Sequence, residues 1–145
     1  MSKFHVDELI NASQEHTFEF ISDLRNVPKW VPGVIRVDHI TGKRISKGTR
    51  FFETRVFRGR ESKTEMEVIA YEPPFRYSTA FTEGGYTAQF NYTLTNERKS
   101  TRVFLICVVN GHGVRKIMEP LVSFAMKRRD KYQLTRLKMA IESLD

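Results

Sequence analysis

The stretch Tyr86-Thr87-Ala88-Gln89-Phe90-Asn91-Tyr92-Thr93-Leu94 alternates strictly between apolar and polar side chains. A period of two is typical of a β-strand that buries one face and exposes the other to water. Strands of this kind are common in antiparallel sheets, whereas strands of parallel sheets are usually apolar on both faces. The pattern therefore predicts an antiparallel strand whose inward face consists of Tyr86, Ala88, Phe90, Tyr92 and Leu94.

Turn-forming residues divide the surrounding segment 34–111 into about six strands. The turn signals fall at 41–43, 46–48, 58–60, 72–74, 83–85 and 96–98. Because these intervals leave no room for crossover helices, we expect hairpins or a meander. Upstream, residues 4–10 alternate well enough for a first strand, with Phe4, Val6, Glu8 and Ile10 on one face.

Helical patterns flank the strands. Ser13 is a plausible N-cap for a short helix whose apolar face is Phe18, Ile21 and Leu24. Two prolines around Trp30 permit at most another helical turn before Gly33.

Beyond Gly113 a long helix is predicted, and Pro120 marks a kink or a late start in it. We expect one apolar stripe, made of Val114, Ile117, Met118, Leu121, Val122 and Ala125 and continued by Leu134, Leu137, Ile141 and Leu144.

Length and composition favour a single domain over residues 1–145. Hydrophobic residues make up 40% of the chain and charged residues 28%, which is enough for a packed core and argues against intrinsic disorder. The 24 Lys and Arg residues exceed the 17 Asp and Glu residues by +7, which favours acidic partners without deciding the fold. The apolar run 103–109 is too short to span a membrane, and residues 1–13 lack a secretory signal core. We therefore expect a cytoplasmic protein without a membrane span.

The strand predicted over residues 50–57 has two contrasting faces. One carries Phe51, Glu53, Arg55 and Phe57, and the other carries Phe52, Thr54 and Val56. If the first face points inward, Glu53 and Arg55 need each other, water or a ligand, because unpaired buried charges are costly. If the second face points inward, both charges are ordinary surface groups. The residues alone leave both orientations open.

Five short segments in the same order resemble the SRPBCC or START-like superfamily, and its polyketide cyclase/dehydrase branch most of all. Each is weak alone, but together they extend over roughly residues 3–144. They are Ile10–Asp23 with its Ala-x-x-Glu-x-x-Phe pattern, Pro28-Lys29-Trp30-Val31-Pro32-Gly33, Gly48-Thr49-Arg50-Phe51, Tyr71-Glu72-Pro73-Pro74 and Arg136–Glu142.

The resemblance implies an α+β helix-grip fold. In that fold a seven-stranded antiparallel sheet curves around a long C-terminal helix, two short helices follow the first strand, and a pocket lies between sheet and helix. The resemblance also favours the inward orientation of Glu53 and Arg55. Members bind lipids, sterols, polyketides, quinones or hormone-like molecules, and a minority are aromatases or cyclases. We therefore expect binding of a small, largely hydrophobic ligand. The alternatives are a polyketide cyclase or aromatase, and a ribosome- or nucleic-acid-associated adaptor.

The expected ligand-binding residues combine an apolar wall with one polar end. They are Trp30, Phe51, Glu53, Arg55, Phe57, Phe90, Tyr92 and Met118, with Ala125 beside Met118 on the helix. No catalytic residue is assigned, although Glu53 as a base and Arg55 as a carbonyl-polarising group are the candidates for a cyclase. Trp30 either closes the pocket mouth or anchors a short helix. The hydroxyls of Tyr77, Tyr86 and Tyr92 either reach the pocket or belong to side chains that pack in the core.

Other reactive residue types predict little chemistry. His5, His16, His39 and His112 show no metal-ligand spacing, so we expect neither a metal nor another cofactor. A single cysteine excludes an internal disulfide and a cysteine-based zinc site, and Cys107 is typical of a small buried apolar residue.

Two surfaces suggest partners. The basic run 127–129 has Lys131, Arg136 and Lys138 nearby, and Asp130 lies among these charges. Because these charges spread around the helix, we interpret it as a solvated outer face rather than a nucleic-acid surface. The strand over 102–109 is apolar on both faces, with Phe104, Ile106 and Val108 opposite Val103, Leu105 and Cys107. One of these faces should line the interior, so we expect the other, on the convex side of the sheet, to form a homodimer contact.

Overall fold

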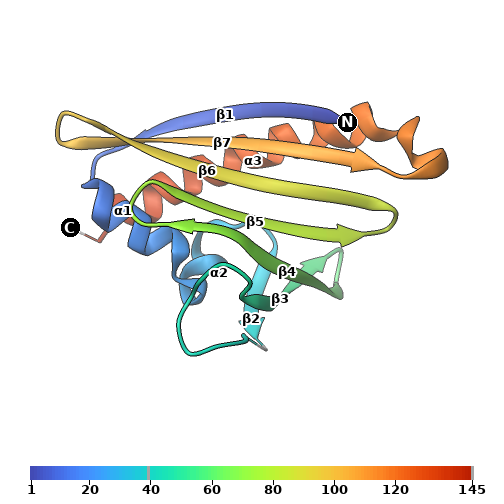
Figure 1. Cartoon of the computed structure of the whole chain (residues 1–145), viewed down its shortest axis with the longest axis horizontal. Coiled ribbons are helices and arrows are strands. Elements are labelled where there is room, and N and C mark those ends of the chain that lie inside the picture. Colours follow the sequence, from blue (N-terminus) through green and yellow to red (C-terminus); the bar gives the residue numbers. More distant parts are fainter. Residues whose placement is uncertain (39, 145) are drawn as a thin grey trace.

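The computed structural model describes residues 1–38 and 40–144, which fold into one curved sheet covered by helices (Figure 1). The elements in chain order are β1 (Ser2–Ile10), α1 (Gln14–Ser22), the 3-10 helix η1 (Leu24–Asn26), α2 (Val27–Trp30), β2 (Val34–Asp38), β3 (Arg50–Phe57), β4 (Arg60–Glu72), β5 (Arg76–Glu83), β6 (Tyr86–Glu97), β7 (Ser100–Gly111), the 3-10 helix η2 (Gly113–Lys116) and α3 (Glu119–Glu142).

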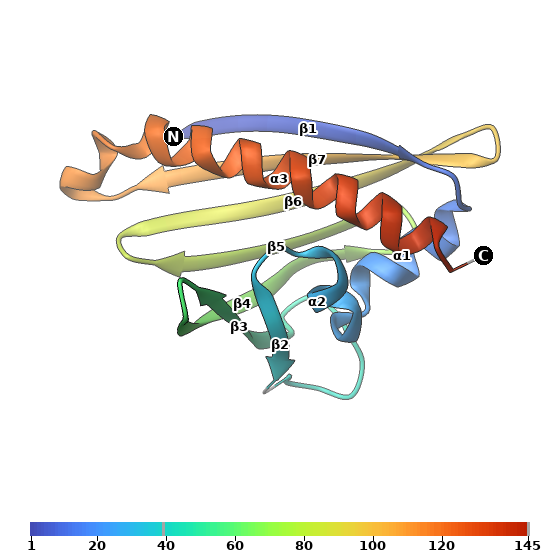
Figure 2. The ribbon, with the colours of Figure 1, turned by 180° about the vertical axis from the view of Figure 1, so that it is seen from behind.

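The seven strands form a single antiparallel sheet in the order β1-β7-β6-β5-β4-β3-β2. Tight turns join the central strands. At Gly84 and Gly85 both φ angles are positive, 60° and 80°, a conformation that glycine adopts without strain. A register shift between Val68 and Ala70 interrupts the β4–β5 ladder, and such irregularities bend a sheet. Figure 2 shows α3 lying across the face of this sheet, which confirms the helix-grip architecture.

The core lies between α3 and the concave face of the sheet. Ala88, Phe90, Tyr92 and Leu94 of β6 are buried, as the strict alternation predicts, and so are the inward residues of β7, which are Val103, Leu105, Cys107 and Val109. From α3, Leu134, Leu137 and Ile141 pack into this core. These three members of the expected helix stripe are confirmed, whereas Leu144, the last member, is 56% exposed and was wrongly included.

The first half of that stripe was predicted on the wrong face. Val114, Ile117, Met118, Leu121 and Ala125 are all exposed, whereas Val122 is half-buried and packs against the core. Position 125 precedes position 134 by nine residues, which is about half a turn away around an α-helix, so the two sets cannot share a face. The positions that continue the Leu134 face backwards are polar and buried, and they are Glu119, Ser123, Asp130 and Gln133.

The short N-terminal helices close one end of the sheet. The hydroxyl of Ser13 accepts a hydrogen bond from the His16 backbone N–H at 3.1 Å, as expected for an N-cap. Phe18 and Ile21 are buried, and Trp30 of α2 lies edge-on against Tyr92 with ring centroids 5.8 Å apart. Pro120 lies in the first turn of α3 and therefore marks a late start rather than a kink. Within the described residues, no helix combines the length and apolar character needed to cross a bilayer.

Candidate functional site

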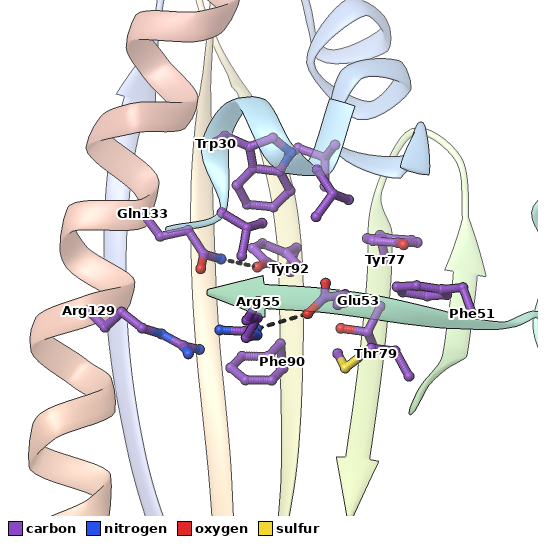
Figure 3. Close-up of a pocket in the computed structure, with 14 residues that line it drawn as sticks. Trp30, Phe51, Glu53, Arg55, Tyr77, Thr79, Phe90, Tyr92, Arg129 and Gln133 are labelled. Atoms are coloured by element: carbon purple, nitrogen blue, oxygen red, sulfur yellow. Dashed lines mark hydrogen bonds and ion pairs between the residues drawn. The ribbon is translucent and has the colours of Figure 1, made fainter. Parts of the chain in front are cut away.

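A cavity lies between the sheet, α2 and the middle of α3 (Figure 3). About 400 Å³ of space lies between its lining side chains and at its mouth, but only about 30 Å³ admits the centre of a water-sized sphere. That is room for about two water molecules. The lining residues are Ile21, Val27, Trp30, Val31, Phe51, Glu53, Arg55, Met66, Tyr77, Thr79, Phe90, Tyr92, Arg129 and Gln133.

An ion pair from β3 forms the polar part of the sheet side. Arg55 Nη2 donates to Glu53 Oε1 at 2.8 Å, and the two side chains are 20% and 6% exposed. β3 thus points Glu53, Arg55 and the buried Phe51 into the cavity, which is the inward orientation of the two considered. The two charges satisfy each other, as burial of a charged group requires.

Helix α3 contributes two further polar groups, Arg129 and Gln133. Gln133 Nε2 donates to Tyr92 Oη at 2.7 Å, while Gln133 Oε1 has no hydrogen-bond partner among residues 1–38 and 40–144. The Arg129 guanidinium lies over the Phe90 ring, 5.9 Å from its centroid. Figure 3 shows both side chains reaching from α3 towards Arg55, Phe90 and Tyr92. The cavity therefore presents two guanidinium groups, one carboxylate and one amide.

Aromatic rings form the floor of the cavity. Tyr77 stacks on Tyr92 with centroids 6.3 Å apart and an angle of 28° between the ring planes. Burial raises the pKa of both phenols above the ordinary value. A nearby carboxylate adds to the shift, that of Glu53 for Tyr77 and that of Asp130 for Tyr92. Both rings are therefore neutral at physiological pH. Because Tyr92 accepts its hydrogen bond from Gln133, its own hydroxyl proton is available to another acceptor.

Asp130 lies behind Arg129, outside the lining residues, and is fully buried. Its closest cation is Arg129, whose Nη2 is 3.5 Å from Asp130 Oδ1. Neither carboxylate oxygen has a hydrogen-bond partner among the described residues. Burial raises the pKa of Asp130 to about 6, although Arg129 opposes the shift. The interpretation of the basic run as a uniformly solvated face is therefore wrong for Arg129 and Asp130, which turn towards the sheet.

The structure brings most of the expected site residues together, namely Trp30, Phe51, Glu53, Arg55, Phe90 and Tyr92. Phe57 was wrongly placed, because it is the last residue of β3, beyond the final pairing with β2 at Arg55 and directly before the turn at 58–59. Phe57 is 73% exposed, and the Arg58 guanidinium lies over its ring. Met118 and Ala125 were also wrongly placed, since both belong to the half of the helix stripe that faces outward.

The sequence interpretation missed Arg129 and Gln133 as lining residues. A signal exists for Gln133, because the spacing of Leu134, Leu137 and Ile141 places positions 130 and 133 on the inward face when it is extended backwards. The same spacing does not single out Arg129. Met66 and Thr79, which also line the cavity, were not singled out either. Tyr77 and Tyr92 line the cavity, whereas half-buried Tyr86 does not.

Other candidate groups lie away from the cavity. Burial raises the pKa of the Cys107 thiol to about 12, which fits a small buried apolar residue better than a nucleophile. Among the described residues, no three His, Cys, Asp or Glu side chains are grouped so that they could hold a metal ion. His39 lies outside the described residues.

Residues 1–142 match the sequence profile of a family described as polyketide cyclase / dehydrase and lipid transport. The chain belongs to this family. No curated protein sequence matches it significantly.

Several solved structures share the fold at low sequence identity. The protein TTHA0849 from Thermus thermophilus has a TM-score of 0.79 and 17% identity, over 99% of both chains. A START superfamily protein from Mycobacterium smegmatis has a TM-score of 0.80 and 13% identity, also over 99% of both chains. The di-domain ARO/CYC protein BexL from the BE-7585A biosynthetic pathway has a TM-score of 0.83 and 16% identity, over 98% of this chain and 47% of BexL.

Proposed function

We propose that the protein binds a small, largely apolar molecule that carries an oxygen-bearing group, with that group placed between Arg55, Arg129 and Gln133. The observation that carries this proposal is the buried Glu53–Arg55 pair inside a cavity whose other walls are mainly aromatic and aliphatic. Ion pairs are costly to bury and often add little stability, so such a pair in a cavity favours a functional role. Membership of a family described by cyclases and lipid transport supports the same ligand chemistry.

The polar groups define what such a ligand offers. Arg55 and Arg129 donate hydrogen bonds, which suits a carbonyl or carboxylate oxygen. Gln133 Oε1 accepts one, which suits a hydroxyl. An oxygenated end would thus meet these groups, while an apolar body packs against Phe51, Phe90 and the tyrosine rings.

Binding requires the cavity to open, because the space for about two waters is far below the roughly 300–1,000 Å³ of ordinary ligand pockets. Arg129 is the side chain best placed to move. Its side chain is 31% exposed and its Nε has no hydrogen-bond partner among the described residues. A ligand that shifts the Arg129 side chain towards the cavity mouth gains space between α2 and α3 without breaking the apolar core, while the guanidinium stays within reach of the ligand oxygen.

A cyclase or aromatase is the second candidate, since Glu53 and Arg55 place a carboxylate and a guanidinium side by side. In that function Arg55 polarises a carbonyl and Glu53 takes a proton. Binding alone is favoured because Glu53 Oε1 is already engaged by Arg55, which leaves only Oε2 as a base.

The test is a titration with decanoate, an apolar chain with a carboxylate, followed through the emission of Trp30, the only tryptophan. A saturable change is expected, and Arg55→Leu should weaken decanoate while leaving an uncharged apolar dye unaffected. Arg50→Leu is the matched control, because Arg50 lies on the same strand but is exposed. If no probe changes Trp30 emission, or if both arginine variants behave alike, the proposal fails.

The homodimer, the cytoplasmic location and the lack of a nucleic-acid partner stay predictions. The outer residues of β7 on which the dimer prediction rests, Phe104, Ile106 and Val108, are half-buried in the single chain.

A further inference from the structure

The outward surface of η2 and the first half of α3 is unusually apolar. Val114, Ile117, Leu121 and Phe124 are 78%, 82%, 62% and 60% exposed, and Met118 lies among them. Large apolar side chains that recur along one exposed helix face form a contiguous patch, which a monomer normally buries. We call the exposed side chains of residues 113–132 the outer α3 face.

The charges on the outer α3 face have one sign. Its exposed charged residues are Arg115, Lys116, Lys127, Arg128 and Lys131. The segment contains two acids, Glu119 and Asp130, and both are buried. Glu119 turns inward to accept the Gly111 backbone N–H at 2.8 Å, and Asp130 turns towards the core beside Arg129. The surface thus combines exposed apolar groups with an uncompensated positive charge.

We propose that the outer α3 face docks on the surface of an anionic lipid bilayer. A helix with apolar side chains on its outward face and flanking Lys and Arg residues lies in the membrane interface, where the chains enter the acyl boundary and the cations meet lipid phosphates. Both halves of that pattern are present on this face. The proposal concerns a surface and not the cavity, so it does not depend on the proposed function.

Charge argues against a second copy of the chain as the occupant. A two-fold dimer through this face would bring the five exposed cations of each copy together with no exposed acid between them. A nucleic acid would match the charge, but it offers nothing to Val114, Ile117 and Leu121, whose aliphatic chains gain only from an apolar environment. An anionic bilayer satisfies both features at once.

The experiment is co-sedimentation of the full chain with vesicles of phosphatidylcholine, alone or mixed with phosphatidylglycerol, at low and at physiological salt. We expect binding to the mixed vesicles that weakens with salt, and far weaker binding to phosphatidylcholine alone. The double substitution Lys127→Gln/Arg128→Gln should lower partitioning about thirty-fold, at the usual contribution of a cation near an anionic surface. Lys43→Gln/Lys47→Gln removes the same charge from two exposed residues of the connection between β2 and β3, outside the outer α3 face, and should have little effect.

A second pair of variants tests the apolar component. Phe124→Ser should lower partitioning about ten-fold or more, whereas Phe75→Ser, at a similarly exposed phenylalanine in the β4–β5 turn, should not. The proposal is overturned if the mixed vesicles do not bind the chain, or if the control variants lose as much binding as the test variants. It is also overturned if the chain is a dimer in solution and Phe124→Ser makes it monomeric. The same holds if Lys127→Gln/Arg128→Gln abolishes RNA binding but leaves vesicle binding unchanged.

Discussion

Asp130→Asn should stabilise the protein at neutral pH, although it removes the partner of Arg129. In the folded chain the carboxyl has a pKa of about 6, against an ordinary value of 3.8, because burial disfavours the charged form more than Arg129 favours it. A raised acid pKa means that the folded state binds the proton more tightly than the unfolded state. The loss of folding stability caused by burying the charged carboxylate is therefore absent below the ordinary pKa. It grows as pH rises from 3.8 to about 6 and is complete above that.

The magnitude follows from the two pKa values. A difference of about two units corresponds to roughly 3 kcal/mol at about pH 8, and to about 0.5 kcal/mol at about pH 4, where about two-fifths of the unfolded carboxyls are still protonated. Asparagine has nearly the same shape and no charge. The variant should thus be more stable than the wild type by about 1–3 kcal/mol at the higher pH and nearly equal to it at the lower pH.

Urea unfolding of both proteins at these two pH values measures the difference, and tryptophan emission reports the transition. Glu61→Gln is a suitable control, because Glu61 is an exposed carboxylate whose contact with Arg36 is loose at 3.7 Å. Its stability should change by less than about 0.5 kcal/mol at either pH. If Asp130→Asn is instead less stable than the wild type, and more so at about pH 8, then Arg129 stabilises the charged carboxylate more than burial disfavours it. The pKa of Asp130 is then not raised, and the prediction is wrong.

Three further predictions concern single groups. Arg55→Leu should weaken the binding of ligands with a carbonyl or carboxylate by about 1.5–3 kcal/mol, and the variant should bind purely apolar ligands at least as well as the wild type. Glu53→Gln should keep the ligand affinity, and it should abolish turnover only if Glu53 is a base. Isothermal titration measures the affinities, and product analysis detects turnover. Glu119→Gln should lower the urea midpoint at neutral pH, because the hydrogen bond from the Gly111 N–H holds the pKa of Glu119 down to about 2. The difference in midpoint between variant and wild type should vanish as pH falls from 4.5 towards 2, and a difference that does not change with pH would contradict this prediction. The Cys107 thiol should react with a disulfide reagent at about pH 8 only as fast as the chain opens, whereas fast reaction in the folded state would show that it is accessible.

The strands could be predicted from the sequence because the alternation of apolar and polar residues indicates which face of a strand is buried. In β6 each apolar side chain that was expected inside is buried or half-buried, since a period of two assigns every residue to one of two faces. The same rule left the orientation of β3 undecided, because both of its faces carry phenylalanine. Only the packing of β3 over the cavity determines that Glu53 and Arg55 lie inside.

The helix was harder to predict because α3 has apolar residues on opposite faces of its two halves. Periodicity detects an apolar stripe but does not say which stripe meets the sheet. Leu134 and Leu137 face the core, whereas Leu121 and Phe124 face outward. Gln133 is buried there because it lines the cavity and donates to Tyr92, and a hydropathy pattern contains neither contact.

Native mass spectrometry shows directly whether the cavity binds an apolar molecule that carries an oxygen-bearing group. The chain would be incubated with an organic extract of its host cells and sprayed under non-denaturing conditions, beside the Arg55→Leu variant. We expect a one-to-one complex with a small apolar compound, which is lost on denaturation and reduced in the variant. Spectra that show only the unliganded mass, or the same complexes in both proteins, would contradict it.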